Sequence, residues 1–166
     1  MSEANAAWEQ RVAALWADID SFDEADFVAR MDRLCAELPP EDPIAAFERG
    51  GSHDSTGRSD LAVPLYEAAL AQGLSGTRRR RATIQLASSL RNLGEHERSI
   101  ELLEAELAAG HDELSGAVRA VLALALTNAG REREAVSVAL IALSEYLPRY
   151  NRSLARYAQE LVAEES

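Results

Sequence analysis

Apolar and small residues return at helical spacing in two stretches near the middle of the chain, and a single glycine separates them. The first stretch covers residues 82–93 and the second covers residues 100–107, with Gly94 between them. Apolar residues every three or four positions form one face of an amphipathic helix. A glycine just past a helix end adopts a left-handed backbone at little steric cost. The pattern therefore predicts two helices that fold back on each other as an antiparallel hairpin.

The same outline recurs once upstream and once downstream. Gly57 lies 37 residues before Gly94 and Gly130 lies 36 residues after it, and a polar turn follows each glycine. The residue five places after each glycine is small: Ala62, Ser99 and Ala135. Self-similarity at such a period is typical of a solenoid of stacked helix pairs. Small residues at the contact points allow neighbouring helices to approach to about 8–10 Å.

The N-terminal stretch predicts one helix from about residue 3 to residue 19. Trp8 and Trp16 both lie on its apolar stripe. We interpret them as side chains that anchor this helix on its neighbours. The alternative is that the stripe is partly exposed and mediates self-association through Trp8 and Trp16, because aromatic residues are favoured at interface centres.

A second helix is predicted over residues 21–38, with Ser21 as its N-cap and Glu24 completing a capping box. Three prolines between residues 39 and 43 then break the chain. The only cysteine, Cys35, lies on the apolar stripe of this helix. Because a reactive thiol needs an accessible, electropositive setting, we predict that Cys35 is buried and structural.

These signals divide the chain into three parts, which we expect to form one domain. The last part is a helix with one apolar and one charged face, as expected of the cap that covers the end of a solenoid. The predicted parts are an N-terminal helical hairpin (1–42) packed on the repeats, three repeats (43–148, divided at about 43–76, 77–112 and 113–148) and a C-terminal capping helix (149–166).

The repeated unit resembles the tetratricopeptide repeat. In that family the first helix ends near a glycine, the second opens with a small residue, and an aromatic residue and an alanine follow one and two turns later. The unit around Gly57 matches best, with Ala62, Tyr66 and Ala69 at these places. The whole chain also resembles bacterial single-domain tetratricopeptide proteins. The resemblance implies an all-α fold, a right-handed superhelix of antiparallel helix hairpins with about nine helices.

In superhelices of this family the first helix of each hairpin lines the inner, concave surface, so the resemblance implies a groove that holds a protein or peptide. The cluster at residues 88–92 favours this, because its serines, arginine and asparagine are poor core residues. Arg91 would hold a carboxylate, and Asn92 and Asn128 would pair with backbone amides. The alternative is that these polar residues only face solvent. By this register the groove residues are Phe47, Asp54, Arg81, Ile84, Ser88, Arg91, Asn92, Leu124, Thr127 and Asn128.

The charge is strongly negative and unevenly placed. The chain has a net charge of −11; residues 1–60 carry 14 acidic and 5 basic side chains, for −9, and residues 61–166 carry 14 and 12, for −2. This balance argues against a nucleic-acid partner, because phosphate contacts require a basic face. All 17 basic residues are arginines, which favours an origin in a GC-rich bacterial genome.

The one dense basic run, residues 78–81, is expected near a helix start, where positive charge opposes the helix macrodipole. The positive charge of this run therefore favours a negatively charged partner. We predict that this partner is the acidic N-terminal segment of the same chain or of a second copy. The alternative is a phosphate or another anionic ligand.

No pattern indicates catalysis, a cofactor or a metal site. The three histidines are far apart and lack ligand spacing, no serine lies in a G-x-S-x-G setting, and no glycine-rich loop follows a strand. No apolar run approaches the roughly 18–20 residues of a membrane span, and the N-terminus does not resemble a signal peptide. We therefore expect a cytoplasmic protein that is not an enzyme and has no membrane partner.

The leading hypothesis is a non-enzymatic scaffold that binds a protein or peptide partner. A second hypothesis is a sensor or regulatory subunit that holds a small anionic ligand in the concave groove. A third is a homodimer formed through the tryptophans of the first helix.

Overall fold

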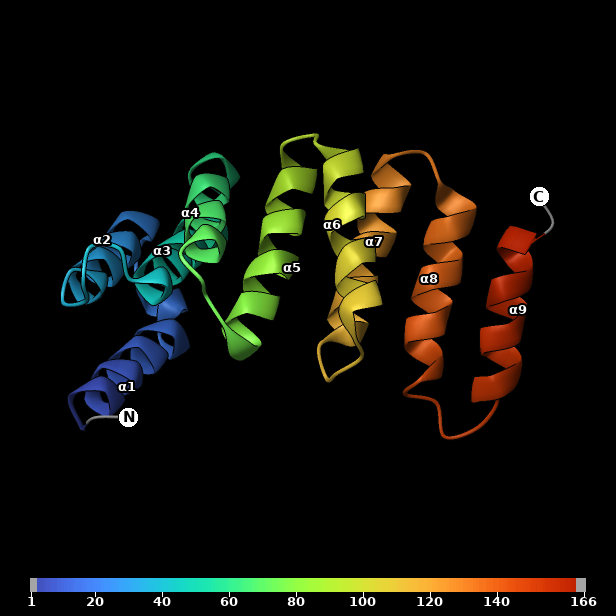
Figure 1. The fold of residues 1–166 in the computed structure, drawn as a ribbon, viewed down its shortest axis with the longest axis horizontal. Helices are drawn as coiled ribbons and strands as arrows, with labels where there is room; N and C mark the ends of the chain where they lie inside the picture. The colour runs from blue at the N-terminus through green and yellow to red at the C-terminus, as the bar shows by residue number, and fades with distance from the viewer. Residues whose placement is uncertain (1–2, 164–166) are drawn as a thin grey trace. The chain divides into compact units, whose positions relative to one another are not determined.

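The structure, a computed structural model, describes residues 3–163, and every regular element in that range is helical (Figure 1). A short 3₁₀ turn, η1 (Ile19–Ser21), follows the first helix. The α-helices of the described range are α1 (Glu3–Ala17), α2 (Glu24–Cys35), α3 (Pro43–Ser55), α4 (Ser59–Ala71), α5 (Gly76–Asn92), α6 (His96–Ala109), α7 (Ser115–Asn128), α8 (Glu132–Ser144) and α9 (Asn151–Ala163). The predicted all-α fold with about nine helices is confirmed for this part of the chain.

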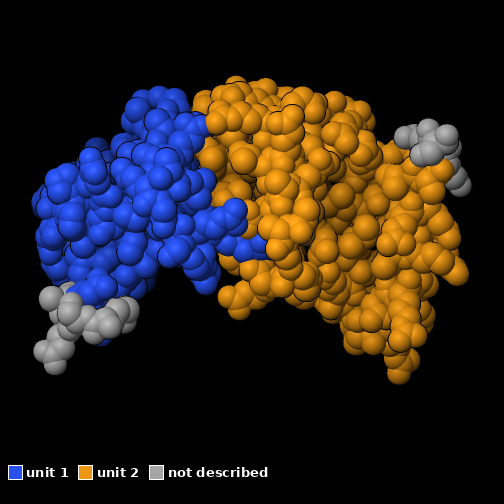
Figure 2. Space-filling view, in the orientation of Figure 1, with its two compact units in different colours: residues 1–82 blue, residues 83–166 orange. Residues whose placement is uncertain are grey.

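The chain divides into two compact units, residues 1–82 and 83–166, and the boundary falls inside α5 (Figure 2). In unit 1, α3 and α4 form a closely packed pair, α2 packs against α3, and α1 packs against α2. In unit 2, α6 packs against α7, α7 against α8, and α8 against α9. Each unit is thus built from helices that contact the next helix along the chain.

The three repeated glycines close their helices with the same backbone geometry. Gly57, Gly94 and Gly130 have φ angles of 74°, 85° and 76°. Glycine adopts this left-handed backbone without the steric cost that a side chain would add. In each turn the amide after the glycine donates to the carbonyl four residues before the glycine: Arg58 to His53 (2.8 Å), Glu95 to Leu90 (2.9 Å) and Arg131 to Leu126 (2.9 Å). The predicted turns are confirmed.

The small residues that follow these glycines lie at helix contacts. Ala62 and Ser99 are 0% exposed, and Ala135 is 5% exposed. The hydroxyl of Ser99 on α6 donates to the Ala87 carbonyl of α5 at 2.7 Å, so the two helix backbones approach closely there. A larger side chain would push the helices apart.

Two helix starts differ from the sequence expectation. The N-cap of α2 is Asp23, whose carboxylate accepts a hydrogen bond from the Asp26 amide at 2.8 Å, and the prediction of Ser21 as the cap was wrong. Ser21 instead ends η1. Ser21 and two acidic residues that could also cap α2 lie within a few positions of each other. Because Asp is as good an N-cap as Ser, the local sequence did not show which of them caps the helix.

The second difference is that α5 begins at Gly76, six residues before the apolar pattern starts. Residues 78–81 are arginines, which hydrophobic periodicity does not detect. Arginine nevertheless covers apolar surface with its aliphatic stem, and Arg80 is only 8% exposed. The start of α3, in contrast, matches its proline signal: Pro43 is the first helical residue, and the Asp42 carboxylate caps the Ile44 amide at 2.8 Å.

Replacing Gly50 with alanine is expected to destabilise unit 1. A Cβ atom at position 50 would lie 2.8 Å from Cδ1 of Tyr66, whose side chain is 0% exposed and has no room to move. Overpacking a core costs about 1–3 kcal/mol, which exceeds or offsets the gain of roughly 1 kcal/mol in helix propensity. Denaturant unfolding should show a lower midpoint for Gly50→Ala.

Gly116→Ala is the matched control. A Cβ atom there would lie 2.6 Å from the hydroxyl oxygen of Tyr146, but this ring is 70% exposed and turns away freely. The unfolding midpoint should therefore stay at the wild-type value or rise, because no overpacking offsets the gain in helix propensity there. A Gly50→Ala protein as stable as wild type would contradict the close packing of α3 on α4.

Candidate functional site

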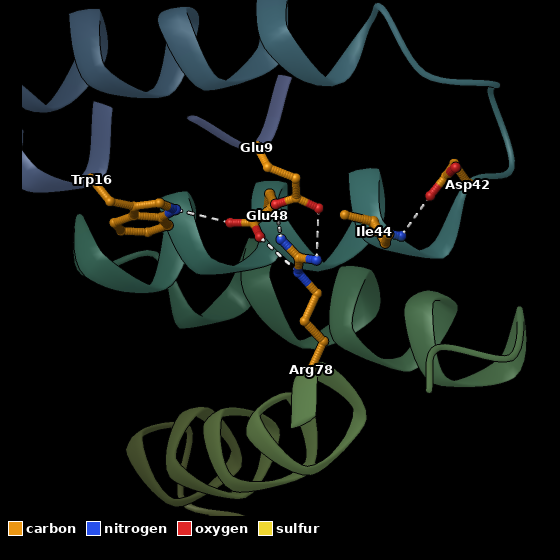
Figure 3. Close-up of polar contacts among 6 residues, drawn as sticks. All are labelled: Glu9, Trp16, Asp42, Ile44, Glu48 and Arg78. Atoms are coloured by element: carbon orange, nitrogen blue, oxygen red, sulfur yellow. Dashed lines mark hydrogen bonds and ion pairs between the residues drawn. The ribbon is translucent and has the colours of Figure 1, made fainter. Parts of the chain in front are cut away.

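Arg78, the first arginine of the basic run near the start of α5, is neutralised inside unit 1. Arg78 donates to both carboxylate oxygens of Glu9, at 2.9 and 2.5 Å, and its Nε donates to Glu48 at 3.2 Å (Figure 3). The other oxygen of Glu48 accepts a hydrogen bond from the indole N–H of Trp16 at 2.8 Å. Because Glu9 and Trp16 lie on α1, Glu48 on α3 and Arg78 on α5, this network connects three helices.

Glu48, which receives both Arg78 and Trp16, is the buried member of this network. Glu48 is 4% exposed, and the side chain of Arg78 is 27% exposed. The pKa of Arg78 is raised, first by the hydrogen bond to Glu9 and then by the charge of Glu48, although burial acts in the opposite direction. The predicted partner of the basic run, the acidic N-terminal segment of the same chain, is thus confirmed for Arg78.

The unit 1 residues that the register assigned to a groove do not form one accessible surface. Phe47 is 2% exposed, and the guanidinium of Arg81 lies over its ring, 5.4 Å from the centroid. Asp54 is half-buried and accepts a long hydrogen bond of 3.5 Å from the Ser59 hydroxyl. Because the Phe47 side chain belongs to the core, we leave it out of the candidate site.

Both tryptophans of α1 hold this helix in place. Trp8 is 3% exposed and donates from its indole nitrogen to the Leu34 carbonyl at 2.8 Å. Trp16 packs edge-on against Phe27, with ring centroids 5.1 Å apart, and donates to Glu48. These contacts match the anchoring interpretation, and Trp8 offers no surface to a second copy.

In unit 2 the structure brings together the three polar residues of the predicted clamp. Arg91 donates from Nη2 to the Asn92 side chain at 2.8 Å and from Nη1 to the Asn128 side chain at 3.2 Å. Asn92 ends α5 and Asn128 ends α7, so the cluster lies where these helices terminate. The Nε atom of Arg91 is buried and has no hydrogen-bond partner among the described atoms.

An apolar groove lies beside this cluster on α7 and α8. Its volume is about 430 Å³, and its lining is Ala120, Ala123, Leu124, Thr127, Ala135, Val136 and Ala139. Leu124 is 51% exposed and Val136 is 50% exposed, so two branched apolar side chains face solvent at its rim. The Thr127 hydroxyl donates to the Ala123 carbonyl at 2.9 Å, which satisfies that hydroxyl donor within its own helix.

Two of the residues that the register assigned to a groove line this one. Leu124 and Thr127 were assigned to it by register, whereas Val136 and Ala139 were missed because the register considered only the first helix of each hairpin. Ile84 was assigned to the groove but is 9% exposed and belongs to the core cluster of unit 2, so we leave it out. Its place on the same apolar stripe as Ala87 was the signal that could have shown this. Ser88 is half-buried.

Neither a metal site nor a membrane span is evident in the part of the chain that the structure describes. No group of three or more His, Cys, Asp or Glu side chains within residues 3–163 is placed to hold a metal ion. None of the helices in the same range combines the length and apolarity that crossing a bilayer requires. Cys35 is 1% exposed, as predicted for a structural thiol.

Replacing Glu48 with alanine is expected to destabilise unit 1 by about 2–4 kcal/mol. Removing one partner of a buried ion pair costs roughly 3–5 kcal/mol, and the remaining bonds of Arg78 to Glu9 reduce this loss. Glu48→Gln keeps an acceptor for Trp16 and should lose less. Urea unfolding measures the stability of both variants.

Asp60→Ala removes an exposed partner of Arg58 and is the control, which should leave the unfolding midpoint unchanged. A wild-type midpoint for Glu48→Ala would exclude a stabilising role for the network.

The Cys35 thiol is expected to resist modification in the folded protein. Burial raises its pKa to about 12, so at pH 8 the reactive thiolate is nearly absent, and the sulfur is also shielded. Ellman's reagent should therefore react slowly with the native chain at pH 8 and rapidly after unfolding in guanidinium chloride. Equal rates in both states would show that the core around Cys35 opens readily.

Comparison with known proteins agrees with this architecture. The family model described as "Tetratrico peptide repeat" matches residues 43–161, from the start of α3 into α9. A solved structure named "MamA MSR-1 C2" has the same fold, with a TM-score of 0.58 and 19% sequence identity over 98% of this chain and 91% of that chain. No curated protein matches the chain. Since the family match covers well over half of the sequence, this protein belongs to the tetratricopeptide repeat family.

Proposed function

We propose that the protein is a non-enzymatic interaction scaffold that binds a segment of a partner protein in the apolar groove of unit 2. The observation that carries this proposal is the groove on α7 and α8, with Leu124 and Val136 half exposed at its rim. Concave apolar surface with exposed branched side chains is typical of binding sites rather than of an inert surface. Its Ala, Leu, Thr and Val side chains provide no general acid or base, which supports binding rather than catalysis.

The small-residue lining of the groove favours an amphipathic helix as the bound segment. Four of its seven lining residues are alanines, and they come from two neighbouring helices. Small residues let a third helix approach to about 8–10 Å, as the helices of the chain itself do at Ala62 and Ser99. Such a ligand would present apolar residues at positions i, i+3, i+4 and i+7 to the groove.

The polar cluster makes one end of the groove chemically different from the other. Asn128 follows Thr127 directly on α7, so the cluster of Arg91, Asn92 and Asn128 lies at the Thr127 end of the groove. A carboxylate forms a stronger hydrogen bond with a guanidinium than an amide oxygen does. We therefore expect the bound helix to carry an acidic residue near the end that reaches Arg91.

A small anionic ligand is the alternative occupant. The apolar lining supports the protein partner instead, because an anion would lose its hydration there and gain only the Arg91 guanidinium. A cytoplasmic location also belongs to this proposal. The free Cys35 is consistent with a reducing compartment.

Selection of peptides from a random phage-displayed library on the immobilised full chain tests the proposal. Enriched sequences should carry apolar residues at helical spacing and an acidic residue at one end. A synthetic peptide from this pool should bind Leu124→Asp at least ten-fold more weakly than wild type, because a buried carboxylate would replace an apolar contact. Fluorescence anisotropy gives the dissociation constants.

Leu61→Asp is the matched control, since Leu61 is also an exposed leucine (38%) but lies on α4 of unit 1. Its affinity for the peptide should equal that of wild type. A peptide that binds Leu124→Asp as tightly as wild type would exclude the groove as the site. A small anion whose stabilising effect is lost in Arg91→Ala but kept in Leu124→Asp would favour the alternative ligand.

A further inference from the structure

The segment from Tyr146 to Tyr157, which we call the Tyr–Arg surface, has a composition unlike the rest of the chain. Three of the four tyrosines lie in it, Tyr146, Tyr150 and Tyr157, and they are 70%, 77% and 53% exposed. Arg149, Arg152 and Arg156 also lie in it, all exposed, and it contains no acidic residue. A net charge of +3 therefore stands beside three solvent-facing aromatic rings in a chain of net charge −11.

Tyr150 is held in a backbone conformation that its side chain disfavours. Its φ angle is 67°, and it is the only non-glycine residue with positive φ among the described residues. Its carbonyl accepts hydrogen bonds from the Leu154 amide at 2.9 Å and the Ser153 hydroxyl at 3.0 Å, which start α9. Asparagine or glycine would adopt this conformation more readily, so starting the helix does not require a tyrosine. An exposed ring at a strained position indicates a role outside the fold.

The arginines of this surface are also unbalanced. Arg149 and Arg152 lie at the start of α9, where positive charge opposes the helix macrodipole. Within the described range, neither guanidinium has a carboxylate partner, whereas Arg156 pairs with Glu160 at 3.5 Å. Tyrosine and arginine are the residues that most often dominate protein interfaces. A partner that fits this surface therefore carries acidic side chains for the arginines and apolar area against which the tyrosine rings can pack.

The same chain carries a complementary surface in unit 1. Residues 18–26, which we call the acidic turn, join α1 to α2 and contain five carboxylates and no basic residue: Asp18, Asp20, Asp23, Glu24 and Asp26. Asp23 caps α2 and Asp26 pairs with Arg30. No arginine among the described residues pairs with Asp18, Asp20 or Glu24, and all three are exposed.

We infer that the Tyr–Arg surface of one copy docks on the acidic turn of a second copy. The two surfaces have opposite charge, both lack internal partners for most of their charges, and they belong to different units. The contact joins different surfaces of the two copies, so it is heterologous: one copy keeps its acidic turn free, and the other copy keeps its Tyr–Arg surface free. Association through such a contact is head to tail, and it forms a ring where the rotation between copies closes and an open chain where it does not.

The contributions of the ion pairs and the tyrosine rings predict the affinity and the salt dependence of this contact. A single exposed ion pair contributes little to affinity, so the tyrosine rings must provide most of the buried area and the charges the orientation. The association should be weak and strongly dependent on ionic strength. Raising the salt from about 0.01 M to about 1 M shortens the Debye length from about 30 Å to about 3 Å and should dissociate the copies.

Sedimentation velocity over a hundred-fold range of protein concentration tests the inference. In low salt the wild-type chain should form dimers and longer species as concentration rises, and in high salt it should remain monomeric. The double variants Arg149→Glu/Arg152→Glu and Asp18→Arg/Asp20→Arg should each associate at least ten-fold more weakly. Mixing them should restore association, because each provides the surface that complements the other.

Arg98→Glu makes the same change of charge at an exposed arginine of α6 and is the control, which should associate as wild type does. A wild-type chain that is monomeric at every concentration in low salt would overturn the inference. So would association that survives both double variants, or single variants that fail to complement each other when mixed.

Tyr150→Asn separates an interface role from a structural one. Asparagine relieves the backbone strain, so the thermal midpoint of the monomer should rise, while the loss of the ring should weaken association at least ten-fold. A more stable protein that still associates like wild type would show that the ring of Tyr150 is not in the contact.

Discussion

The close approach of successive helices is the constraint on which this structure depends. A glycine with a left-handed backbone reverses the chain, and a buried small residue five positions later sets the distance between the helices. Gly94 and Ser99 show both parts, because the Ser99 hydroxyl reaches the backbone carbonyl of Ala87 on the preceding helix. A helix pair of this kind cannot bury its apolar face alone, so each pair must be covered by the next helix along the chain.

In unit 1, a network of charged side chains adds to the packing of the helices. Four successive arginines, residues 78–81, lie near the start of α5, where positive charge without a partner is unfavourable. Arg78 instead reaches two carboxylates, Glu9 and Glu48, on two other helices, and Glu48 also receives the Trp16 indole. A buried pair of this kind contributes modestly to net stability, but its geometry is directional, so it fixes the register of α1 and α5 on α3 more sharply than apolar contacts do.

The sequence predicted those features that depend on local backbone rules. The glycine turns and the buried small residues follow from steric requirements that act within six residues, and α9 was placed correctly from its two-faced pattern. The start of α5 was missed because arginine stems pack without a hydrophobic signal. In the candidate site, the register included Leu124 and Arg91 but not Val136. Which face of a second helix remains uncovered depends on where the neighbouring helices end, and one sequence does not contain that information.

Exposed large apolar side chains are distributed unevenly between the two units. Of the large apolar side chains that are exposed in the described range, six lie between Leu124 and Tyr157, and only Leu61 lies in unit 1. Exposing such side chains favours non-specific association, so they are expected where a contact compensates for their exposure. The net charge is shared almost evenly, with 15 acidic and 9 basic side chains in residues 1–82 (−6) and 13 and 8 in residues 83–166 (−5). In the two contacts proposed above, the groove and the Tyr–Arg surface belong to unit 2, and the acidic turn belongs to unit 1. Because the groove lies on α7 and α8 and the Tyr–Arg surface begins after α8, a partner helix and a second copy can occupy different parts of unit 2, and association of copies would then increase the number of grooves presented together.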